Sequence, residues 1–220
     1  MKHFSKTDII EMERVYRLNL INSCTGYKSA NLIGSISTKN VCNVAVFSSI
    51  THLGSDPALL TFIVRPTTVP RDTYKNIIDT KEFTVNHINV NDIEDAHHTS
   101  ARYPAMISEF DMTNLEKEFL EGYKAPFVKS SLIKLGCKFL NQYEIIENNT
   151  LLIVAEINDI FFNENIIQEK IINIYKPVRI KNKNLIKVYF SKENKLIKKE
   201  TVNKGDQEYY LDLKSRFVFN

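Results

Sequence analysis

The chain has 220 residues, of which 43% are hydrophobic and 25% are charged, as is ordinary for a globular protein. Its net charge of +3 fits binding of a phosphorylated ligand but is too small to indicate a nucleic-acid-binding protein. No stretch approaches the roughly 18 consecutive apolar residues of a membrane span, and we expect no targeting segment. The three cysteines are far apart and form no Cys-x-x-Cys pair, so they predict reduced thiols in a cytoplasmic protein.

The first third of the chain is predicted to form a short helix followed by strands. Residues 8–14 read as a helix that Asp8 caps, with Glu11 three residues later. Residues 30–37 and 41–48 predict a hairpin with a polar turn. The second of these strands ends in a predicted loop that is rich in hydroxyl groups.

Helices are predicted between the strands of the middle third. Nearly continuous apolar residues at 59–64 predict a strand covered on both faces. A helix over 72–79 follows, and 83–86 is the next predicted strand. Further helices are predicted over residues 91–102 and 114–121.

A long hairpin is predicted next, formed by an alternating segment at 133–144 and an apolar strand at 151–160. From about residue 163 the composition shifts towards Lys, Asn, Ile and Tyr. We therefore divide the chain into a barrel domain, residues 1–163, and a basic C-terminal extension, residues 164–220. The extension is interpreted as a solvated appendage packed on the barrel, with a partner-docking surface as the alternative.

The order of these elements predicts the fold class. Strands come first in hairpins and do not alternate strictly with helices. This order favours a mostly β protein, an antiparallel barrel with peripheral helices, over a doubly wound parallel sheet.

Motifs of several enzyme classes are absent. No two of the six glycines lie two positions apart, so neither a dinucleotide-binding Gly-x-Gly-x-x-Gly nor a P-loop is present. His-Glu-x-x-His and Gly-x-Ser-x-Gly are absent as well. His97 and His98 are adjacent and would point about 100° apart on a helix, so we predict no metal site.

Several side chains that could bind a phosphate lie close together in one part of the sequence. Ser48 and Ser49 follow a strand, and Arg65 ends the next one. Arg71 and Thr73 lie at the start of the helix predicted over 72–79. A phosphate binds hydroxyl donors and arginine, and a helix N-terminus adds free N–H groups and a favourable dipole. One arginine alone would be interpreted as a surface residue, but the combination predicts an anion site.

The same region carries an ordered series of motifs. They are Asn31-Leu32-Ile33-Gly34, Asn43-x-Ala45-x-Phe47-Ser48-Ser49-x-x-His52-x-Gly54-Ser55-x-Pro57, Arg65-Pro66, Arg71-Asp72-Thr73-Tyr74-x-Asn76-Ile77, Phe83-Thr84-x-Asn86, His98-Thr99-Ser100-Ala101, Ser108-Glu109-Phe110 and Ala125-Pro126-Phe127-Val128. Together they resemble the flavin reductase-like family, the FMN-binding split-barrel proteins that include flavoredoxin, over about residues 10–160.

The resemblance implies a six-stranded antiparallel split barrel with a Greek-key core, and a homodimer with one FMN per protomer near its interface. It places backbone N–H groups of the strand from Asn43 to Ser49 beside N5 and O4 of the isoalloxazine ring. It places the ribityl phosphate against Ser48, Ser49, Arg71 and Thr73. The expected cofactor-binding residues are Asn43, Val44, Ala45, Val46, Phe47, Ser48, Ser49, His52, Arg65, Arg71, Thr73 and Asn86.

The activity implied by the resemblance is hydride transfer from NADH or NADPH to FMN, as in an NAD(P)H:flavin reductase. The flavin carries this chemistry, so no catalytic side chain is expected. His52 or His98 is expected to contact nicotinamide or substrate. The alternatives are a flavoredoxin-like electron carrier with tightly bound FMN and a protein partner, and a barrel that binds another ligand. A monooxygenase is one candidate partner, and the family's usual closing segment after the last barrel strand is not evident here.

Overall fold

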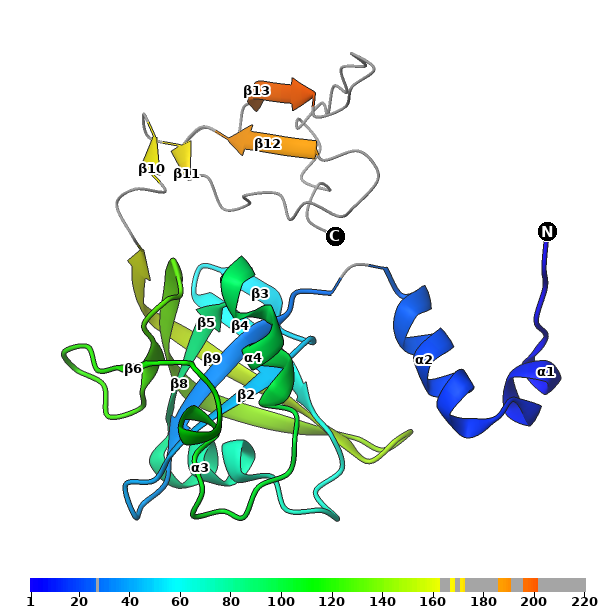
Figure 1. Ribbon diagram of the computed structural model, residues 1–220, viewed down its shortest axis with the longest axis horizontal. Helices are drawn as coiled ribbons and strands as arrows, with labels where there is room; N and C mark the ends of the chain where they lie inside the picture. Colours follow the sequence, from blue (N-terminus) through cyan, green and yellow to red (C-terminus); the bar gives the residue numbers. More distant parts are fainter. Residues whose placement is uncertain (27, 163–166, 169–170, 173–185, 191–195, 202–220) are drawn as a thin grey trace.

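The structure is a computed structural model that describes residues 1–26, 28–162, 167–168, 171–172, 186–190 and 196–201 (Figure 1). Its helices are α1 (Lys6–Glu11), α2 (Arg14–Cys24), α3 (Asp72–Thr80) and α4 (Ile93–His98), with 3-10 turns η1 (Val90–Asp92) and η2 (Glu109–Met112). Its strands are β1 (Asn31–Ile36), β2 (Cys42–Phe47), β3 (Thr51–Ser55), β4 (Ala58–Val64), β5 (Glu82–His87), β6 (Lys117–Glu118), β7 (Phe127–Val128), β8 (Ile133–Ile145), β9 (Thr150–Phe162), β10 (Ile167–Gln168), β11 (Ile171–Ile172), β12 (Ile186–Phe190) and β13 (Leu196–Thr201).

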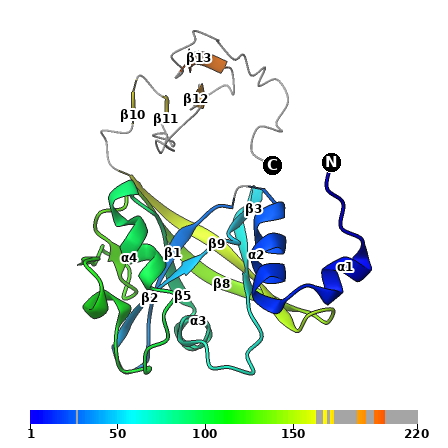
Figure 2. The same ribbon diagram turned by 45° about the vertical axis from the view of Figure 1, so that its right-hand side comes forward.

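A seven-stranded sheet forms the body of the protein. Its strand order is β2-β1-β5-β8-β9-β4-β3, and every neighbouring pair is antiparallel. The sheet curls into an open barrel, with α3 at one end and α4 across the outside near β2 (Figures 1 and 2). The antiparallel barrel predicted from the order of elements is therefore present, with β2 and β3 as its two edge strands.

Hydrophobic packing occurs on both faces of β1, the strand beside β2. Ile33 faces a core inside the barrel, where it packs with residues such as Phe62, Phe83 and Ile77 of α3. Leu32, its neighbour, faces a second core under α4 and η2. Successive residues of a strand point to opposite faces, so a strand between two cores is buried along its whole length, as β1 is. This double burial fixes β1 and the adjoining β2 in one register.

The predicted strands other than those of the extension are confirmed, including the long hairpin formed by β8 and β9. The predicted loop after β2 is wrong, because Thr51–Ser55 forms β3 and pairs with β4. Four of the five residues of β3 are exposed, so this edge strand lacks the apolar alternation of a buried strand. Glycine, serine, aspartate and proline in this segment suited a turn equally well.

The helix prediction is correct for α3 and less accurate elsewhere. Ser5, and not Asp8, caps the first helix, and Asp8 completes the capping box with it. The helix expected over 91–102 is shorter, because α4 ends at His98. The helix expected over 114–121 is wrong, since this segment contains the short strand β6, which pairs with β7.

The helices α1 and α2 form an N-terminal helical arm that extends away from the barrel (Figure 1). Neither helix has a buried residue. Several large apolar side chains of the arm are about half exposed or more, including Ile10 at 61%, Val15 at 60% and Leu18 at 50%. Isolated helices of this length are marginal in water, so the arm needs a surface to pack against.

Among the residues that the structure describes, no helix is long and apolar enough to cross a membrane. The described part of the chain also contains no group of three or more His, Cys, Asp and Glu side chains that could hold a metal ion. The predicted extension, residues 164–220, lies outside the described residues apart from β10 to β13.

Candidate functional site

The N-terminus of α3 is open to an acceptor. Arg71 occupies the N-cap position with extended backbone, and its side chain makes no capping hydrogen bond. The helix therefore begins without a side-chain cap. The first N–H groups of a helix have no partner within the helix, and an uncapped start leaves them available to an anion.

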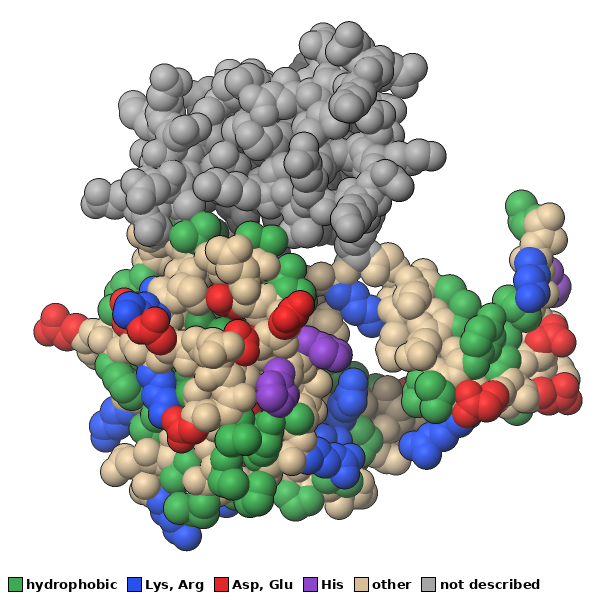
Figure 3. All heavy atoms as spheres, in the orientation of Figure 1, with side chains coloured by type: hydrophobic (Ala, Val, Ile, Leu, Met, Phe, Trp, Pro, Cys, Tyr) green, Lys and Arg blue, Asp and Glu red, His purple; other side chains and the backbone are tan. Residues whose placement is uncertain are grey.

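The side chain of Arg71 adds positive charge at this point. Its Nε atom is buried and has no hydrogen-bond partner among the described residues. Burial lowers the pKa of Arg71, and the positive charges of Arg65 and Arg102 lower it further. Lys and Arg side chains also gather on the side of the barrel that faces the helical arm (Figure 3). A buried donor that lacks a partner and lies near other positive charges fits an anionic ligand. Such a ligand would accept a hydrogen bond from the donor and offset the positive charges.

Ser49 ties the end of β2 to the end of β4. Its Oγ accepts a hydrogen bond from the N–H of Ile63 at 3.0 Å and lies 3.4 Å from the carbonyl oxygen of the same residue. Ser49 is therefore held by the strand that leads to Arg65. Ser48, its neighbour, is exposed. The structure thus links the serine pair to the arginine at the end of β4, with Ser48 as the hydroxyl that faces solvent.

The free edge of β2 is already occupied at two positions. Glu109 accepts from the N–H of Val44 at 3.1 Å, and Thr99 Oγ1 accepts from the N–H of Val46 at 3.0 Å. The expectation that backbone donors along this strand bind the flavin ring does not hold for these two residues in this conformation. Ala45 and Phe47 are half-buried on the same strand, and Phe47 packs edge-on against Phe62 inside the barrel.

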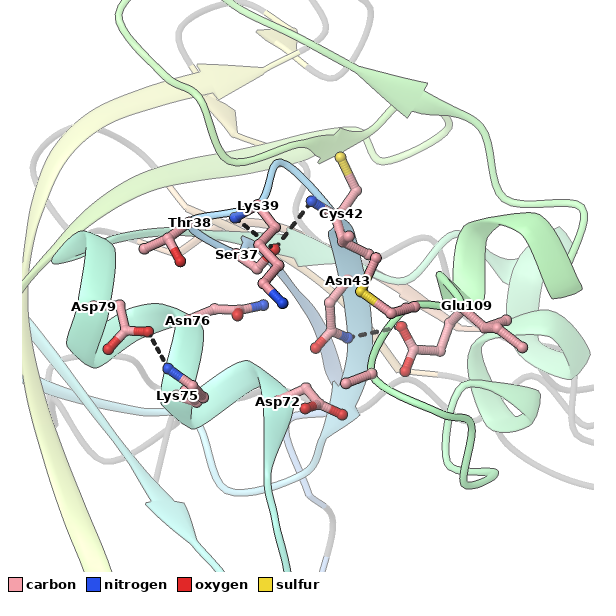
Figure 4. Close-up of a pocket in the computed structure, with 14 residues that line it drawn as sticks. Ser37, Thr38, Lys39, Cys42, Asn43, Asp72, Lys75, Asn76, Asp79 and Glu109 are labelled. Atoms are coloured by element: carbon pink, nitrogen blue, oxygen red, sulfur yellow. Dashed lines mark hydrogen bonds and ion pairs between the residues drawn. The ribbon is translucent and has the colours of Figure 1, made fainter.

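A hydrogen-bonded network joins β2 to α3 and η2. Asn43 Nδ2 donates to Glu109 Oε2 at 2.8 Å, and Thr73 Oγ1 donates to Asn43 Oδ1 at 3.1 Å. Asn43 and Glu109 lie on the wall of a cavity of about 200 Å³ (Figure 4). The cavity is lined by residues Ser37, Thr38, Lys39, Val41, Cys42, Asn43, Asp72, Lys75, Asn76, Asp79, Ala105, Met106, Ile107 and Glu109. Arg71 lies outside it, on a second cavity of about 280 Å³ beside α3.

Asn86, which was expected to contact the cofactor, is fully buried instead. Its exposed fraction is 0%, and its amide donates to Leu32 O and Thr84 Oγ1. Its Oδ1 accepts from the N–H of Val128. Asn86 therefore joins the sheet to β7, and we leave it out of the candidate site.

Neither histidine is joined to the arginines by a hydrogen bond in the described part of the chain. His52 lies on the edge strand β3, where its ring bonds Ser55 Oγ at 3.0 Å. His98 ends α4, and its Nε2 lies 2.7 Å from the hydroxyl of Tyr103. Both rings are exposed, so either can meet a molecule that approaches from solvent.

Comparison with known proteins identifies the family. Residues 28–179 match the model of the flavin reductase like domain. The chain belongs to the flavin reductase like domain family. An uncharacterized Aquifex aeolicus (strain VF5) protein is 30% identical over 165 residues, which cover 71% of this chain and 82% of that protein.

Solved structures show that this flavin reductase like chain has the split-barrel fold. A candidate flavin reductase with a split barrel domain from Shewanella frigidimarina NCIMB 400 is 35% identical. The match has a TM-score of 0.74 and covers 96% of this chain and 100% of that chain. Nitrilotriacetate monooxygenase component B from Bacillus cereus has the same fold at 19% identity and a TM-score of 0.67, over 77% of this chain and 85% of that chain. The predicted family and fold class are confirmed.

Three residues of this flavin reductase like site had no role in the sequence analysis. They are Thr99 and Glu109, which cover the edge of β2, and Arg102, whose charge acts on Arg71. Thr99 and Glu109 stand in motifs that carried the family resemblance, so the motifs marked the segment without showing its contacts. No local pattern distinguishes Arg102 from a surface arginine.

Proposed function

We propose that the protein is an FMN-dependent oxidoreductase of the NAD(P)H:flavin reductase type, which transfers hydride from NADH or NADPH to bound FMN. The observation that supports this most directly is the unpartnered Nε of Arg71 at the uncapped start of α3. Family membership makes a flavin the expected ligand.

The phosphate of FMN fits the donors at this point. A phosphate monoester carries close to two negative charges at neutral pH and offers three acceptor oxygens. Arg71, Arg65 and Arg102 supply positive charge, and the first turn of α3 supplies N–H groups. Ser48 is exposed and adjoins Ser49, which is anchored to the backbone of Ile63, two residues before Arg65. In this proposal these groups bind the phosphate end of FMN, and Thr73 joins them from the second position of α3.

The remaining site residues would hold and shield the ring. When bound, the flavin supplies the hydride-accepting chemistry, so the protein's task is to bind and orient it. The β2 residues Ala45 and Phe47 present a fixed apolar surface because the strand is held by β1 on one edge and by Thr99 and Glu109 on the other. His98, the exposed last residue of α4, is bonded to half-buried Tyr103 and in this proposal contacts the nicotinamide or the substrate.

A homodimer is part of the proposal. The two cavities beside α3 measure about 200 and 280 Å³, below the roughly 300–1,000 Å³ of most ligand pockets. A flavin held at the arginines would therefore remain open to water on a single chain. The exposed apolar residues of the helical arm need a covering surface, and a second copy would supply both covers. A monooxygenase or electron-transfer partner and a cytoplasmic location remain predictions.

The visible absorption spectrum of the purified full-length chain tests the proposal. We expect a flavin spectrum, either as purified or after incubation with FMN. Anaerobic addition of NADH or NADPH should then bleach the flavin at a catalytic rate. Bleaching only after addition of a reducing protein would indicate the electron carrier instead. A chain that binds neither FMN nor riboflavin would refute both functions.

A further inference from the structure

A relay of hydrogen bonds connects a carboxylate with the phosphate-binding end of α3. Thr73 Oγ1 donates to Asn43 Oδ1 at 3.1 Å, and Asn43 Nδ2 donates to Glu109 Oε2 at 2.8 Å. Thr73 is 6% exposed and Asn43 is 7% exposed, so water does not compete freely for these groups. Figure 4 shows the Asn43 side chain directed towards Glu109. All donors of the relay point towards the carboxylate.

This direction conflicts with phosphate binding at Thr73. A threonine hydroxyl has one proton to donate, and here the proton is directed to Asn43. A phosphate dianion only accepts hydrogen bonds. Thr73 can therefore donate to a phosphate only if Asn43 stops accepting its proton.

Protonation of Glu109 would reverse the relay. The proton comes from solvent and forms an O–H bond on the Glu109 carboxyl group, and no other covalent bond changes. After the Asn43 amide turns over, that O–H donates to Oδ1 and the Nδ2 group donates to Thr73 Oγ1. The Thr73 proton is then free for the ligand. The Glu109 oxygen retains lone pairs for the N–H of Val44, so the edge of β2 stays satisfied.

The surroundings of Glu109 favour this uptake of a proton. Burial raises the pKa of Glu109 above its usual value, with the negative charge of Asp72 adding to the effect, while hydrogen bonds from Val44 and Asn43 oppose it in part. The titratable groups near the carboxylate come from several elements. They are Lys39 of the β1–β2 turn, Cys42 of β2, Asp72, Lys75 and Asp79 of α3, and Asp111 with its partner Lys117. Lys75 is paired with Asp79, so the group facing Glu109 from the start of α3 is negative Asp72.

We propose that Glu109 is a positioning residue that sets the direction of this relay, so that binding of the FMN phosphate is coupled to uptake of a proton by Glu109. The inference rests on the proposed function and adds a pH dependence to it. Riboflavin, which has no phosphate, is bound without this uptake. The coupling lies entirely in the residues of this chain and does not require turnover.

The pH dependence of FMN binding tests the proposal, with full-length wild type and Glu109→Gln compared between pH 6 and pH 8. Binding that requires one proton weakens by up to tenfold per pH unit above the pKa of the group. Wild-type affinity should therefore fall relative to the variant as pH rises. Glu109→Gln keeps the shape of the side chain but has no carboxyl group to titrate, so no proton is taken up at this position in the variant. Titration of the phosphate itself affects both proteins equally and cancels in the ratio of dissociation constants.

Two controls separate coupling from a loss of structure. The ratio measured with riboflavin should not change with pH. Thr73→Val, which keeps the side-chain shape, should also lose the excess pH dependence, whereas Thr73→Ser should keep it. If Glu109 has only a structural role, Glu109→Gln should bind both FMN and riboflavin more weakly. The ratio of the wild-type and variant dissociation constants should then not change with pH. A flat ratio for FMN would overturn the relay and leave the proposed function standing, whereas wild type that binds neither ligand would overturn both.

Discussion

Replacement of Arg71 by methionine should make the ligand-free protein more stable while it weakens FMN binding. A buried donor without a partner costs about 1–3 kcal/mol, and the low end applies because Arg71 is only half-buried. Methionine keeps the apolar packing of the side chain and removes both the unpaired Nε and one of three neighbouring positive charges. We expect a gain of roughly 1 kcal/mol, which for a chain of this size raises the melting temperature by about 2–4 °C.

The same substitution should cost roughly 2–5 kcal/mol of FMN binding if Arg71 is a partly buried partner of the phosphate. This corresponds to a loss of about 30-fold to about 4,000-fold in affinity. Thermal unfolding without flavin measures the first effect, and titrations with FMN and riboflavin measure the second. Riboflavin affinity should be unchanged.

Lys124→Met is the matched control for this experiment, since it removes one positive charge from an exposed position of the barrel. It should change neither the melting temperature nor FMN affinity appreciably. If Arg71→Met lowers the melting temperature and binds FMN as the wild type does, Arg71 is a structural residue and the anion site is refuted.

Substitutions at three further positions test the fold and the assembly. Gly34→Ala should destabilise the protein by roughly 1–3 kcal/mol in urea denaturation, because its Cβ would lie 2.1 Å from the carbonyl oxygen of Pro126; an unchanged midpoint would contradict this close approach. Thr99→Val should cost about 1–3 kcal/mol by removing the acceptor of the Val46 N–H, while Thr99→Ser should remain close to wild type; a Thr99→Val variant as stable as wild type would contradict the role of this hydroxyl. Leu18→Asp, on the exposed arm, should convert a dimer into a monomer in size-exclusion chromatography with light scattering, and a monomeric wild type at micromolar concentration would refute the dimer.

The parts of the fold that could be predicted from sequence are those with a strong local pattern. The hairpin of β8 and β9 has apolar alternation on one strand, a polar turn and an apolar return strand. The start of α3 was also predicted within one residue. The edge strand β3 was missed because its exposed side chains carry no such pattern, and its pairing with β4 decides its conformation. The segment around β6 was missed for the same reason.

The candidate site divides in the same way. Ser48 and Arg71 stand at element ends that sequence patterns can locate, and both remain in the proposed site. The role of Glu109 depends on Asn43, which is 66 positions away in the chain, so no local pattern could reveal it. Val44 and Val46 were expected to contact the flavin ring. Their N–H groups bond to residues more than 50 positions away, and the sequence could not show these contacts.

The two edges of the sheet differ in a way that bears on function. Four of the five residues of the edge strand β3 are exposed, whereas β2 is capped by Thr99 and Glu109 at the two ends of one segment. The caps prevent another strand from adding to β2, which protects this wall of the site from strand addition. They also fix the segment that carries Arg102 beside Arg71. One pair of side-chain acceptors thus shields the strand and holds the third arginine in place, so the edge of the sheet and the anion site depend on the same two contacts.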